Sequence, residues 1–344
     1  MTDAGGADWT APEVELVAPG VHRIPLPLPN DGLRAVNVYA VEDGDGLVLI
    51  DSGWAIPEAR RRLDDALGSL GCSLADIDRF LITHAHRDHF TQAITVRREW
   101  QTKVSLGAGE RPSLETLHDP DRGRLEPQLN QLLRYGARRL VEEIHAGMEG
   151  HPPLDRSEWE YPDDWLEEGE LSLASGRRLS IIETPGHTRG HVVFHDESAA
   201  LLFAGDHVLP TITPSIGFEP VLSPNPLGDF LGSLARVRQM PDARLLPAHG
   251  PVAPSVHARI DELIAHHGQR LDETMAAVAG GATTAFEVAG QLRWTRRGRT
   301  LDELDQFNQM LAISETGAHL TLLVAQHRIE VVLDGEVYRY SETD

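Results

Sequence analysis

The sequence predicts an α/β fold with additional helices, on three observations. Short apolar runs rich in β-branched residues alternate with stretches of helical periodicity, which is typical of α/β proteins. Segments rich in histidine and aspartate come directly after several of these strand patterns. In α/β architectures the loops at strand ends carry the chemistry. The last 75 or so residues then change to a mostly helical pattern.

The first predicted elements form a β-hairpin. The runs VNVYAV (37–42) and LVLI (47–50) flank the turn Asp43-Gly44-Asp45-Gly46. An Asp-Gly turn between β-rich runs is a hairpin signal. Asp-x-Asp-Gly also occurs in calcium loops, but the remaining ligand positions of such a loop are missing here. Turn chemistry is enough to explain these residues.

The next elements continue the alternation of strands and helices. Apolar positions recur at helical spacing over 56–71, and RFLIT (79–83) reads as a buried strand. Residues 110–170 read as a mostly helical insertion over the site, with QLNQLLRYGARRLVEEIHAGM (128–148) as its clearest helical piece. Four more strands are predicted after the insertion, at 178–184, 191–195, 200–205 and 243–248.

The C-terminal segment has its own pattern. Helices are predicted at 268–280, 284–292 and 302–327, and RIEVVLDGEVYRY (328–340) reads as a hairpin with an Asp-Gly turn. Thr284 and Glu287 fit a capping box at the start of the second helix. Three helices followed by a two-stranded ribbon predict a winged-helix-like domain over 267–344, after a catalytic domain over 1–266.

Composition narrows the class of protein. A chain of 344 residues with 41% hydrophobic residues can bury a large core. The net charge of −22 argues against a long polyanion or an anionic membrane surface as partner. The single cysteine, Cys72, suits a reducing compartment. The N-terminal residues lack a signal-peptide pattern and no apolar stretch reaches the roughly 20 residues of a membrane span, so we expect a cytoplasmic protein.

The chemistry is concentrated in LITHAHRDHFTQA, which follows the strand 79–83. Four ligand-type residues, His84, His86, Asp88 and His89, lie within six positions. Imidazole suits zinc and iron, and a neighbouring carboxylate can bind a second ion. Buried imidazoles without a metal would leave polar nitrogens unsatisfied. The spacing therefore predicts a metal site fed by one loop.

The same ligand types recur at later strand ends. TPGHTRGH contains His187, AGDH contains Asp206 and PAHG contains His249. Two metal sites that share one carboxylate need about seven ligands, and this is the number found. The alternative reading of each histidine, as a core or surface residue, is preferred only for His191 and His195, which lie on the strand after the metal loop.

At this point the chain resembles the metallo-β-lactamase superfamily, whose HxHxDH pattern matches residues 84–89 without a gap. The resemblance implies a four-layer αββα sandwich from about residue 20 to 265. It also implies two divalent metal ions, with zinc expected and iron or manganese as alternatives. Asp51, in VLIDSGW, matches the family's aspartate that orients a ligand. The implied ligands are His84, His86 and His187 for one ion, Asp88, His89 and His249 for the other, and Asp206 as the bridge.

Two ions sharing a carboxylate lower the pKa of a bridging water toward about 7. We therefore expect a metal-bridging hydroxide to attack the carbonyl of an ester or thioester, with Asp206 and Asp88 as catalytic carboxylates and Asp88 helping in proton transfer. Single-iron dioxygenase chemistry occurs in related branches, but His89 and His249 favour two metals. An idle binding module would show a broken ligand set, and here the set is complete.

The choice of substrate rests on weaker signals. The motifs and the ISETGAHLTLL segment (313–323) resemble the glyoxalase II-like branch and its β-lactamase-like protein 2 subgroup. The tail lacks the basic region with which glyoxalase II grips glutathione, so other thioesters, such as acyl-CoA, are favoured. A ribonuclease or phosphodiesterase is the alternative, since Arg293, Arg296, Arg297 and Arg299 form a basic run. Lactonase or β-lactamase-like activity comes after these, because the common lactamases have a cysteine at the position of Asp206.

The expected partners are a small-molecule substrate and, as for relatives with such tails, a second copy of the chain. The segment 207–226 follows Asp206 and is mostly apolar, so we expect it to line the substrate pocket with Phe218. His207 and Arg189 are candidates for substrate contacts. A structural role is the alternative for each residue. For Arg189 that role would be a salt bridge within the protein.

Overall fold

Strand-forming sequences between residues 15 and 166 assemble into one mixed sheet, whose order follows the chain from β1 to β7. The computed structural model describes residues 8–29, 32–119, 123, 125–148 and 155–343. The predicted Asp-Gly hairpin is confirmed, because β3 pairs antiparallel with β4 through Asp43 and Gly46. The sheet contains β1 (Glu15–Ala18), β2 (Val21–Pro27), β3 (Ala35–Asp43), β4 (Gly46–Ile50), β5 (Ile77–Ile82), β6 (Lys103–Gly107) and β7 (Asp164–Leu166).

The second sheet is also mixed and has the order β12-β11-β10-β9-β8. The β11–β12 pair is parallel and the other pairs are antiparallel. All four strands predicted between 178 and 248 are confirmed. The sheet contains β8 (Gly169–Ser172), β9 (Arg178–Glu183), β10 (Val192–Asp196), β11 (Leu201–Gly205) and β12 (Arg244–Pro247).

Three apolar clusters separate four layers. Helices α1 (Pro57–Ser69) and α2 (Arg87–Trp100) bury one face against the first sheet. Side chains such as Tyr39 and Phe203 fill the space between the sheets. Helices α6 (Pro226–Arg238) and α7 (Val256–Ala279) cover the second sheet. The order helix, sheet, sheet, helix agrees with the predicted sandwich.

The strand directions bring the motif-bearing loops to one edge. β4 and β5 are parallel neighbours, so the residues after both strands emerge together. In the second sheet β9 runs antiparallel to β10, which runs antiparallel to β11, so β9, β11 and β12 all end at one edge. Loops far apart in the sequence are therefore adjacent in space.

The predicted insertion differs from the structure in two ways. Its helical part contains α3 (Arg111–His118), α4 (Glu126–Arg134) and α5 (Arg138–Met148), so the helical piece 128–148 is divided between two helices. The break lies at Gly136, whose φ of 85° is left-handed and suits glycine. The prediction was also wrong beyond residue 160, because β7 and β8 are edge strands there. Edge strands are short and charged and lack the apolar alternation of central strands.

The C-terminal segment consists of helices and a hairpin, and a winged helix is not evident. The capping box of Thr284 and Glu287 is confirmed. The predicted domain boundary at 266/267 falls within α7, which is continuous across it, and the division into domains stays a prediction. The elements are α7, α8 (Ala285–Gln291), α9 (Gln306–Ala325), β13 (Ile329–Asp334) and β14 (Val337–Glu342). Short 3₁₀ turns are η1 (Leu74–Asp76), η2 (Ala108–Glu110), η3 (Arg156–Trp159) and η4 (Leu301–Glu303).

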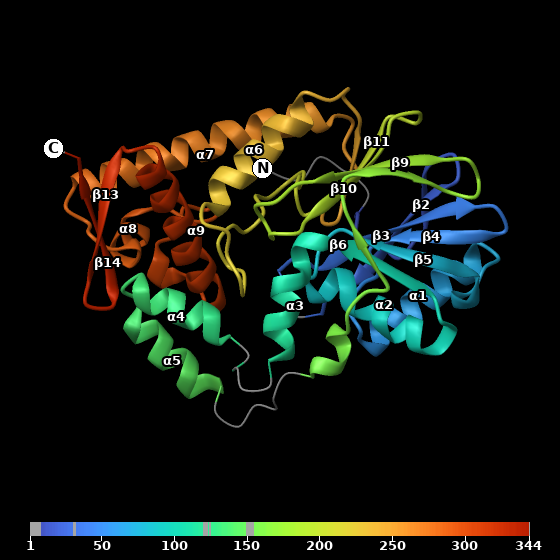
Figure 1. The fold of residues 1–344 in the computed structure, drawn as a ribbon, viewed down its shortest axis with the longest axis horizontal. Helices are drawn as coiled ribbons and strands as arrows, with labels where there is room; N and C mark the ends of the chain where they lie inside the picture. Colours follow the sequence, from blue (N-terminus) through green and yellow to red (C-terminus); the bar gives the residue numbers. More distant parts are fainter. Residues whose placement is uncertain (1–7, 30–31, 120–122, 124, 149–154, 344) are drawn as a thin grey trace.

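Helices α4 and α5 of the insertion pack on this C-terminal segment. Figure 1 shows α4 and α5 beside α8, α9 and the hairpin, at the opposite end of the molecule from β4 and β5. The amide of Phe286 donates to the carbonyl of Tyr135 over 3.0 Å, and Arg134 donates to the hydroxyl of Tyr338 over 3.0 Å. Helices α4 and α5 share one apolar cluster with α7, α8 and α9. We call α4, α5 and residues 256–343 the helical body.

No helix among the residues described has both the length and the apolar character to cross a bilayer.

A close contact in the helical body gives a stability prediction. Gly317 on α9 packs against the buried ring of Tyr135, and a Cβ at this position would overlap the ring. We expect Gly317→Ala to lower the free energy of unfolding by about 1–3 kcal/mol, since overpacking forces neighbours to shift. Urea denaturation measures this change. The matched control is Gly268→Ala on α7, where nothing lies near the new Cβ, and it should stabilise by roughly 0.5–1 kcal/mol. Equal effects of the two substitutions would contradict the tight contact.

Candidate metal centre

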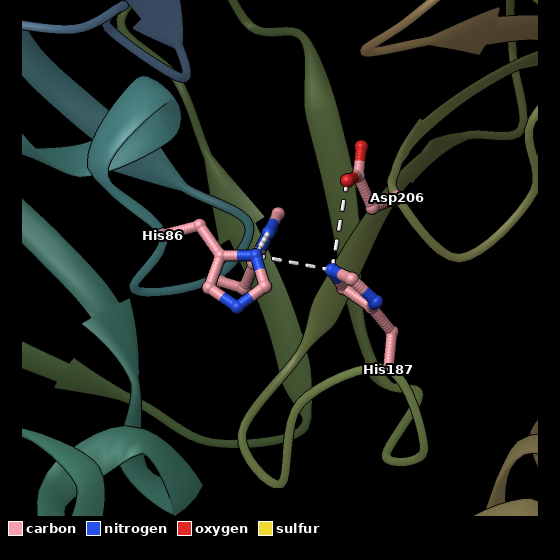
Figure 2. Close-up of side chains that lie close together, drawn as sticks. His86, His187 and Asp206 are labelled. Carbon is pink, nitrogen blue, oxygen red and sulfur yellow. Dashed lines mark hydrogen bonds and ion pairs between the residues drawn. The ribbon is translucent and has the colours of Figure 1, made fainter. Parts of the chain in front are cut away.

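The first group of ligand-type atoms comes from three loops at the shared edge. His84 and His86 follow β5, His187 follows β9 and Asp206 follows β11. Nε2 of His187 lies 3.2 Å from Nδ1 of His86 and 3.5 Å from Oδ2 of Asp206 (Figure 2). Nε2 of His84 lies 3.0 Å from the same nitrogen of His86. These four side chains therefore face a common point.

The second group lies next to the first. Asp88 and His89 are in the first turn of α2, and His249 follows β12. Oδ2 of Asp88 lies 3.4 Å from Nε2 of His249 and 3.6 Å from Nε2 of His89. One ligand atom from each residue lies within 4.8 Å of the others. The seven residues singled out by the sequence are thus brought together as two groups.

Asp206 contacts both groups. Its Oδ2 faces His187, while its Oδ1 lies 3.4 Å from Nε2 of His249 and 3.7 Å from Nε2 of His89. The backbone of Asp206 is anchored by His191, because its N–H donates to Nε2 of that ring over 3.1 Å. His191 therefore has a supporting role, as the sequence suggested. The carboxylate is positioned to bridge two ions.

Hydrogen bonds on the outer side fix the histidine tautomers. Four of the five rings have one nitrogen against a carbonyl or carboxylate oxygen, which can only accept, so that nitrogen carries the proton. The opposite nitrogen then presents a lone pair to the site. The pairs are His86 Nε2 with Glu219 (2.7 Å), His89 Nδ1 with Asp51 (2.9 Å), His187 Nδ1 with the Ser215 carbonyl (2.7 Å), and His249 Nδ1 with the Ala35 carbonyl (2.8 Å).

Asp51 fixes the fifth ring through Thr83. The Thr83 hydroxyl donates to the Asp51 carboxylate over 3.0 Å, so its oxygen accepts from Nδ1–H of His84, also over 3.0 Å. The Thr83 amide donates to Asp51 over 2.8 Å as well. Asp51 has a left-handed φ of 60°, which aspartate tolerates better than most residues. One buried carboxylate thereby orients a histidine in each group.

The donor set fits divalent metal ions. His89 Nε2, His249 Nε2 and Asp206 Oδ1 are buried and have no hydrogen-bond partner among the described residues. Leaving such atoms unpaired costs about 1–3 kcal/mol each. Zinc with nitrogen and oxygen ligands at roughly 2.0–2.1 Å places neighbouring ligand atoms about 3.3 Å apart. The ligand-atom distances given above run from 3.0 to 3.7 Å, which agrees with the spacing around a shared ion.

The charges of the centre also favour bound metal ions. Burial lowers the pKa of His84 well below its usual value, and the neighbouring histidines lower it further, so this ring is neutral. Burial would also lower the pKa of His89, but the carboxylates of Asp88, Asp51 and Asp206 raise it to about 10. The surplus of negative charge around His89 is what a bound cation would neutralise.

Two acidic residues of the site were missed in the sequence. Glu219 accepts from His86, and Glu110 lies buried beside it and accepts from the Thr188 hydroxyl. Glu219 is the one acidic residue in the apolar segment 207–226, and that isolation was a usable signal. Glu110 stands in a helical stretch far from any motif, so its sequence context carries no such signal.

Glu110 gives a pH-dependent prediction. Burial and the nearby Glu219 carboxylate raise the pKa of Glu110 to about 7, from 4.5. Between these values the folded protein holds a proton that the unfolded chain has lost, so the free energy of unfolding falls as the pH rises. We expect the wild type to lose about 2–3 kcal/mol more than Glu110→Gln between pH 4.5 and 7.5. Urea denaturation in excess chelator measures this difference, and parallel pH profiles would refute it.

The three residues expected to contact the substrate are not members of the two ligand groups. His207 is fully buried, with its ring edge-on to Phe230 at 5.4 Å between centroids. Arg189 is exposed in the loop that carries His187. Phe218 is half-buried and packs edge-on against Phe307 of α9 at 5.7 Å. As substrate contacts, all three stay predictions, and Phe218 and Arg189 are the more accessible candidates.

The basic run is close to the segment 207–226. All four arginines, Arg293, Arg296, Arg297 and Arg299, are exposed. Arg296 donates to the carbonyl of Thr211, five residues after Asp206. The helical body therefore contacts the loop that follows the bridging carboxylate.

Comparison with known proteins covers both the motifs and the whole chain. The family model described as "Metallo-beta-lactamase superfamily" matches residues 31–249, which include all seven ligand-type residues. The probable metallo-hydrolase YqjP of Bacillus subtilis is 26% identical over 340 residues, covering 91% of this chain and 94% of that protein. A beta-lactamase-like protein 2 homolog of Caenorhabditis elegans is 26% identical over 238 residues, covering 69% of this chain and only 63% of that protein.

Two further similarities bear on the chemistry and on the fold. The atrochrysone carboxyl ACP thioesterase dmxR1 of a Cryptosporiopsis species is 24% identical over 301 residues, covering 84% of this chain and 76% of that protein. Among solved structures, a beta-lactamase domain protein from Burkholderia ambifaria superposes with a TM-score of 0.81 at 26% identity. That match covers 99% of this chain and 97% of the other, so the similarity includes the helical body.

Proposed function

Because this chain belongs to the metallo-β-lactamase superfamily, we propose that it is a metal-dependent hydrolase whose centre contains two ions. One observation carries the proposal. Two groups of inward-facing nitrogen and oxygen atoms, typical of the binuclear sites of this superfamily, meet at the single carboxylate of Asp206. Hydrolysis needs an activated water and a polarised bond, and a binuclear site supplies both.

The proposed ligands follow from the two groups. His84, His86 and His187 would hold one ion, Asp88, His89 and His249 the other, and Asp206 both. When bound, two divalent ions lower the pKa of a water molecule toward about 7 and polarise the oxygen of the bond to be cleaved. The histidine lone pairs are oriented in advance by Asp51, Glu219 and backbone carbonyls, so the ligands need little rearrangement.

The carboxylates have distinct proposed roles. Burial would raise the pKa of Asp206, but His249, His89 and His187 lower it well below its usual range, so it remains an anion and serves as the bridge. The side chain of Asp88 is 13% exposed, against 9% for Asp206 and 3% for Asp51. We assign proton transfer during hydrolysis to Asp88, because it is the most accessible of the three.

We propose an ester or thioester, of acyl-CoA or related type, as the substrate. The similarity to an ACP thioesterase supports this bond type. The apolar segment 207–226, with Phe218 half-buried, suits an acyl chain. The net charge of −22 weighs against a long nucleic acid.

A phosphodiester is the second candidate. Its support is the exposed run of four arginines, which contacts the segment 207–226 through Arg296 and Thr211. Such a run could bind the phosphates of a short RNA, but also those of a CoA moiety. The charge of the whole chain places this candidate second.

A substrate panel tests the proposal. Purified protein is assayed on an acyl-CoA, a lactone, a β-lactam and a short RNA, and its metal content is measured by mass spectrometry. We expect turnover of the acyl-CoA or the lactone, lost in His84→Ala together with bound metal. Cleavage of RNA alone would show that the substrate is a phosphodiester and not a thioester. Protein that takes up no zinc, iron or manganese would exclude the proposed mechanism.

A further inference from the structure

A second cluster of imidazole and carboxylate groups lies between α7 and α9, within the helical body. His266 and His267 are on α7 and Glu315 is on α9. One ligand atom from each lies within 4.8 Å of the others. None of these residues belongs to the two groups around Asp206, and neither α7 nor α9 supplies a residue to those groups. The cluster is therefore a separate feature of the molecule.

The hydrogen bonds around His267 fix its tautomer. His319, one turn after Glu315 on α9, donates from Nδ1 to the Glu315 carbonyl over 2.8 Å. Its Nε2 is then an acceptor and lies 3.2 Å from Nδ1 of His267. Nδ1 of His267 must carry the proton, so Nε2 of His267 presents a lone pair. His319 thus orients His267 as Asp51 orients His89.

Nε2 of His267 has no partner in the described part of the chain. The residue is fully buried, and this nitrogen is among the buried polar atoms without a hydrogen bond. A buried acceptor left unpaired is costly, and His267 is the buried member of the cluster that it forms with His266 and Glu315. The orphaned nitrogen points to a ligand in the cluster.

The positive charge of the neighbouring Arg270 already has interaction partners. Its guanidinium donates to Glu273 over 2.8 Å and to the Arg293 carbonyl over 3.3 Å. It also lies over the ring of Trp294, 4.5 Å from the centroid. Arg270 therefore has partners of its own outside the cluster. His266 is exposed, so an ion could reach the cluster from solvent.

We propose that His266, His267 and Glu315 bind a divalent transition-metal ion, with Zn²⁺ the expected occupant, as a third metal site that joins α7 to α9. Two imidazoles and one carboxylate suit zinc and its neighbours in the first transition row, and not Mg²⁺ or Ca²⁺, which prefer all-oxygen sites. Three protein ligands leave a fourth position of a tetrahedral ion to water. The site is independent of the hydrolytic centre and of the bond that the protein cleaves.

Zinc stoichiometry of the full-length protein tests the site. Equilibrium dialysis against Zn²⁺ should give three equivalents for the wild type and two for His266→Ala. His145→Ala, which removes an exposed histidine of α5, is the matched control and should keep three. Glu315→Gln should weaken the third equivalent at least tenfold. Asp206→Ala separates this site from the catalytic centre, because it should still bind one equivalent, whereas Asp206→Ala/His266→Ala should bind none.

A thermal measurement gives a second readout in case a variant folds poorly. Zn²⁺ that binds only the folded state raises Tm, so added Zn²⁺ should raise the Tm of Asp206→Ala but not that of Asp206→Ala/His266→Ala. Two equivalents in the wild type, unchanged in His266→Ala, would overturn the third site and leave the proposed function intact. An undiminished metal content in Asp206→Ala would instead count against the catalytic centre.

Discussion

Asp206→Ala is expected to remove both ions of the catalytic centre and to lower kcat/KM by at least about 10³-fold. The carboxylate has one oxygen toward each group of ligands, so its loss opens both sites at once. The ions stabilise the transition state by several kcal/mol, and each 1.36 kcal/mol of this stabilisation changes the rate by a factor of ten. Metal content by mass spectrometry and steady-state kinetics on the preferred substrate measure the two effects.

The control for this substitution is another buried aspartate. Asp196 ends β10, is fully buried and pairs with Arg177, away from the metal centre. Asp196→Asn should reduce stability but keep the metal content and kcat/KM within a few-fold. A fall in metal content of the same size in both variants would show that the loss follows from general destabilisation and not from the bridging position of Asp206.

Asp51→Asn is expected to lower metal affinity by about 10–100-fold without removing any proposed ligand. The carboxylate accepts from Nδ1–H of His89 and from the amide and hydroxyl of Thr83. If the NH₂ group of an asparagine faced His89, this donor would lie against a second donor, Nδ1–H of the ring. The ring would then shift its proton to Nε2, the atom that faces the site, and no lone pair would remain there. Competition with a chromogenic chelator measures the affinity.

Asp51→Asn keeps the shape and the left-handed backbone of the residue, so the comparison isolates charge and proton position. The matched control is Asp43→Asn, which alters a buried aspartate that accepts from the Ser175 amide at 2.5 Å, outside the metal centre. It should leave metal affinity unchanged. Full affinity in Asp51→Asn would mean that His89 keeps its tautomer without the carboxylate, and the orienting role would be wrong.

Much of the centre could be predicted from the sequence because its ligands follow strands. Residues 84–89 are local to one loop, and His187, Asp206 and His249 each follow a strand with a clear apolar pattern. Strands that end at one edge then bring these loops together. The roles of Glu219 and Thr83 were missed, because they depend on contacts between distant segments: Glu219 accepts from His86, and Thr83 donates to Asp51.

The fold likewise has parts that the sequence predicts and parts that it does not. Central strands and amphipathic helices were predicted because burial imposes a period on their side chains. The edge strands β7 and β8 carry no such period, and the break at Gly136 is set by packing of α4 and α5 against residues 284–286 and α9. A sequence of three helices and a hairpin likewise does not determine how they pack, and the expected winged helix is not evident.

The packing of Tyr135 against residues far along the chain constrains the order of folding. Helices α4 and α5 are synthesised before their apolar partners, which lie in α8, α9 and the β13–β14 hairpin, up to about 200 positions later. Such contacts close long loops and form slowly. While the chain is emerging from the ribosome, the apolar faces of these two helices remain uncovered, whereas α1 and α2 find the first sheet almost at once. Residues 126–148 are therefore the segment where we expect a chaperone to bind the nascent chain.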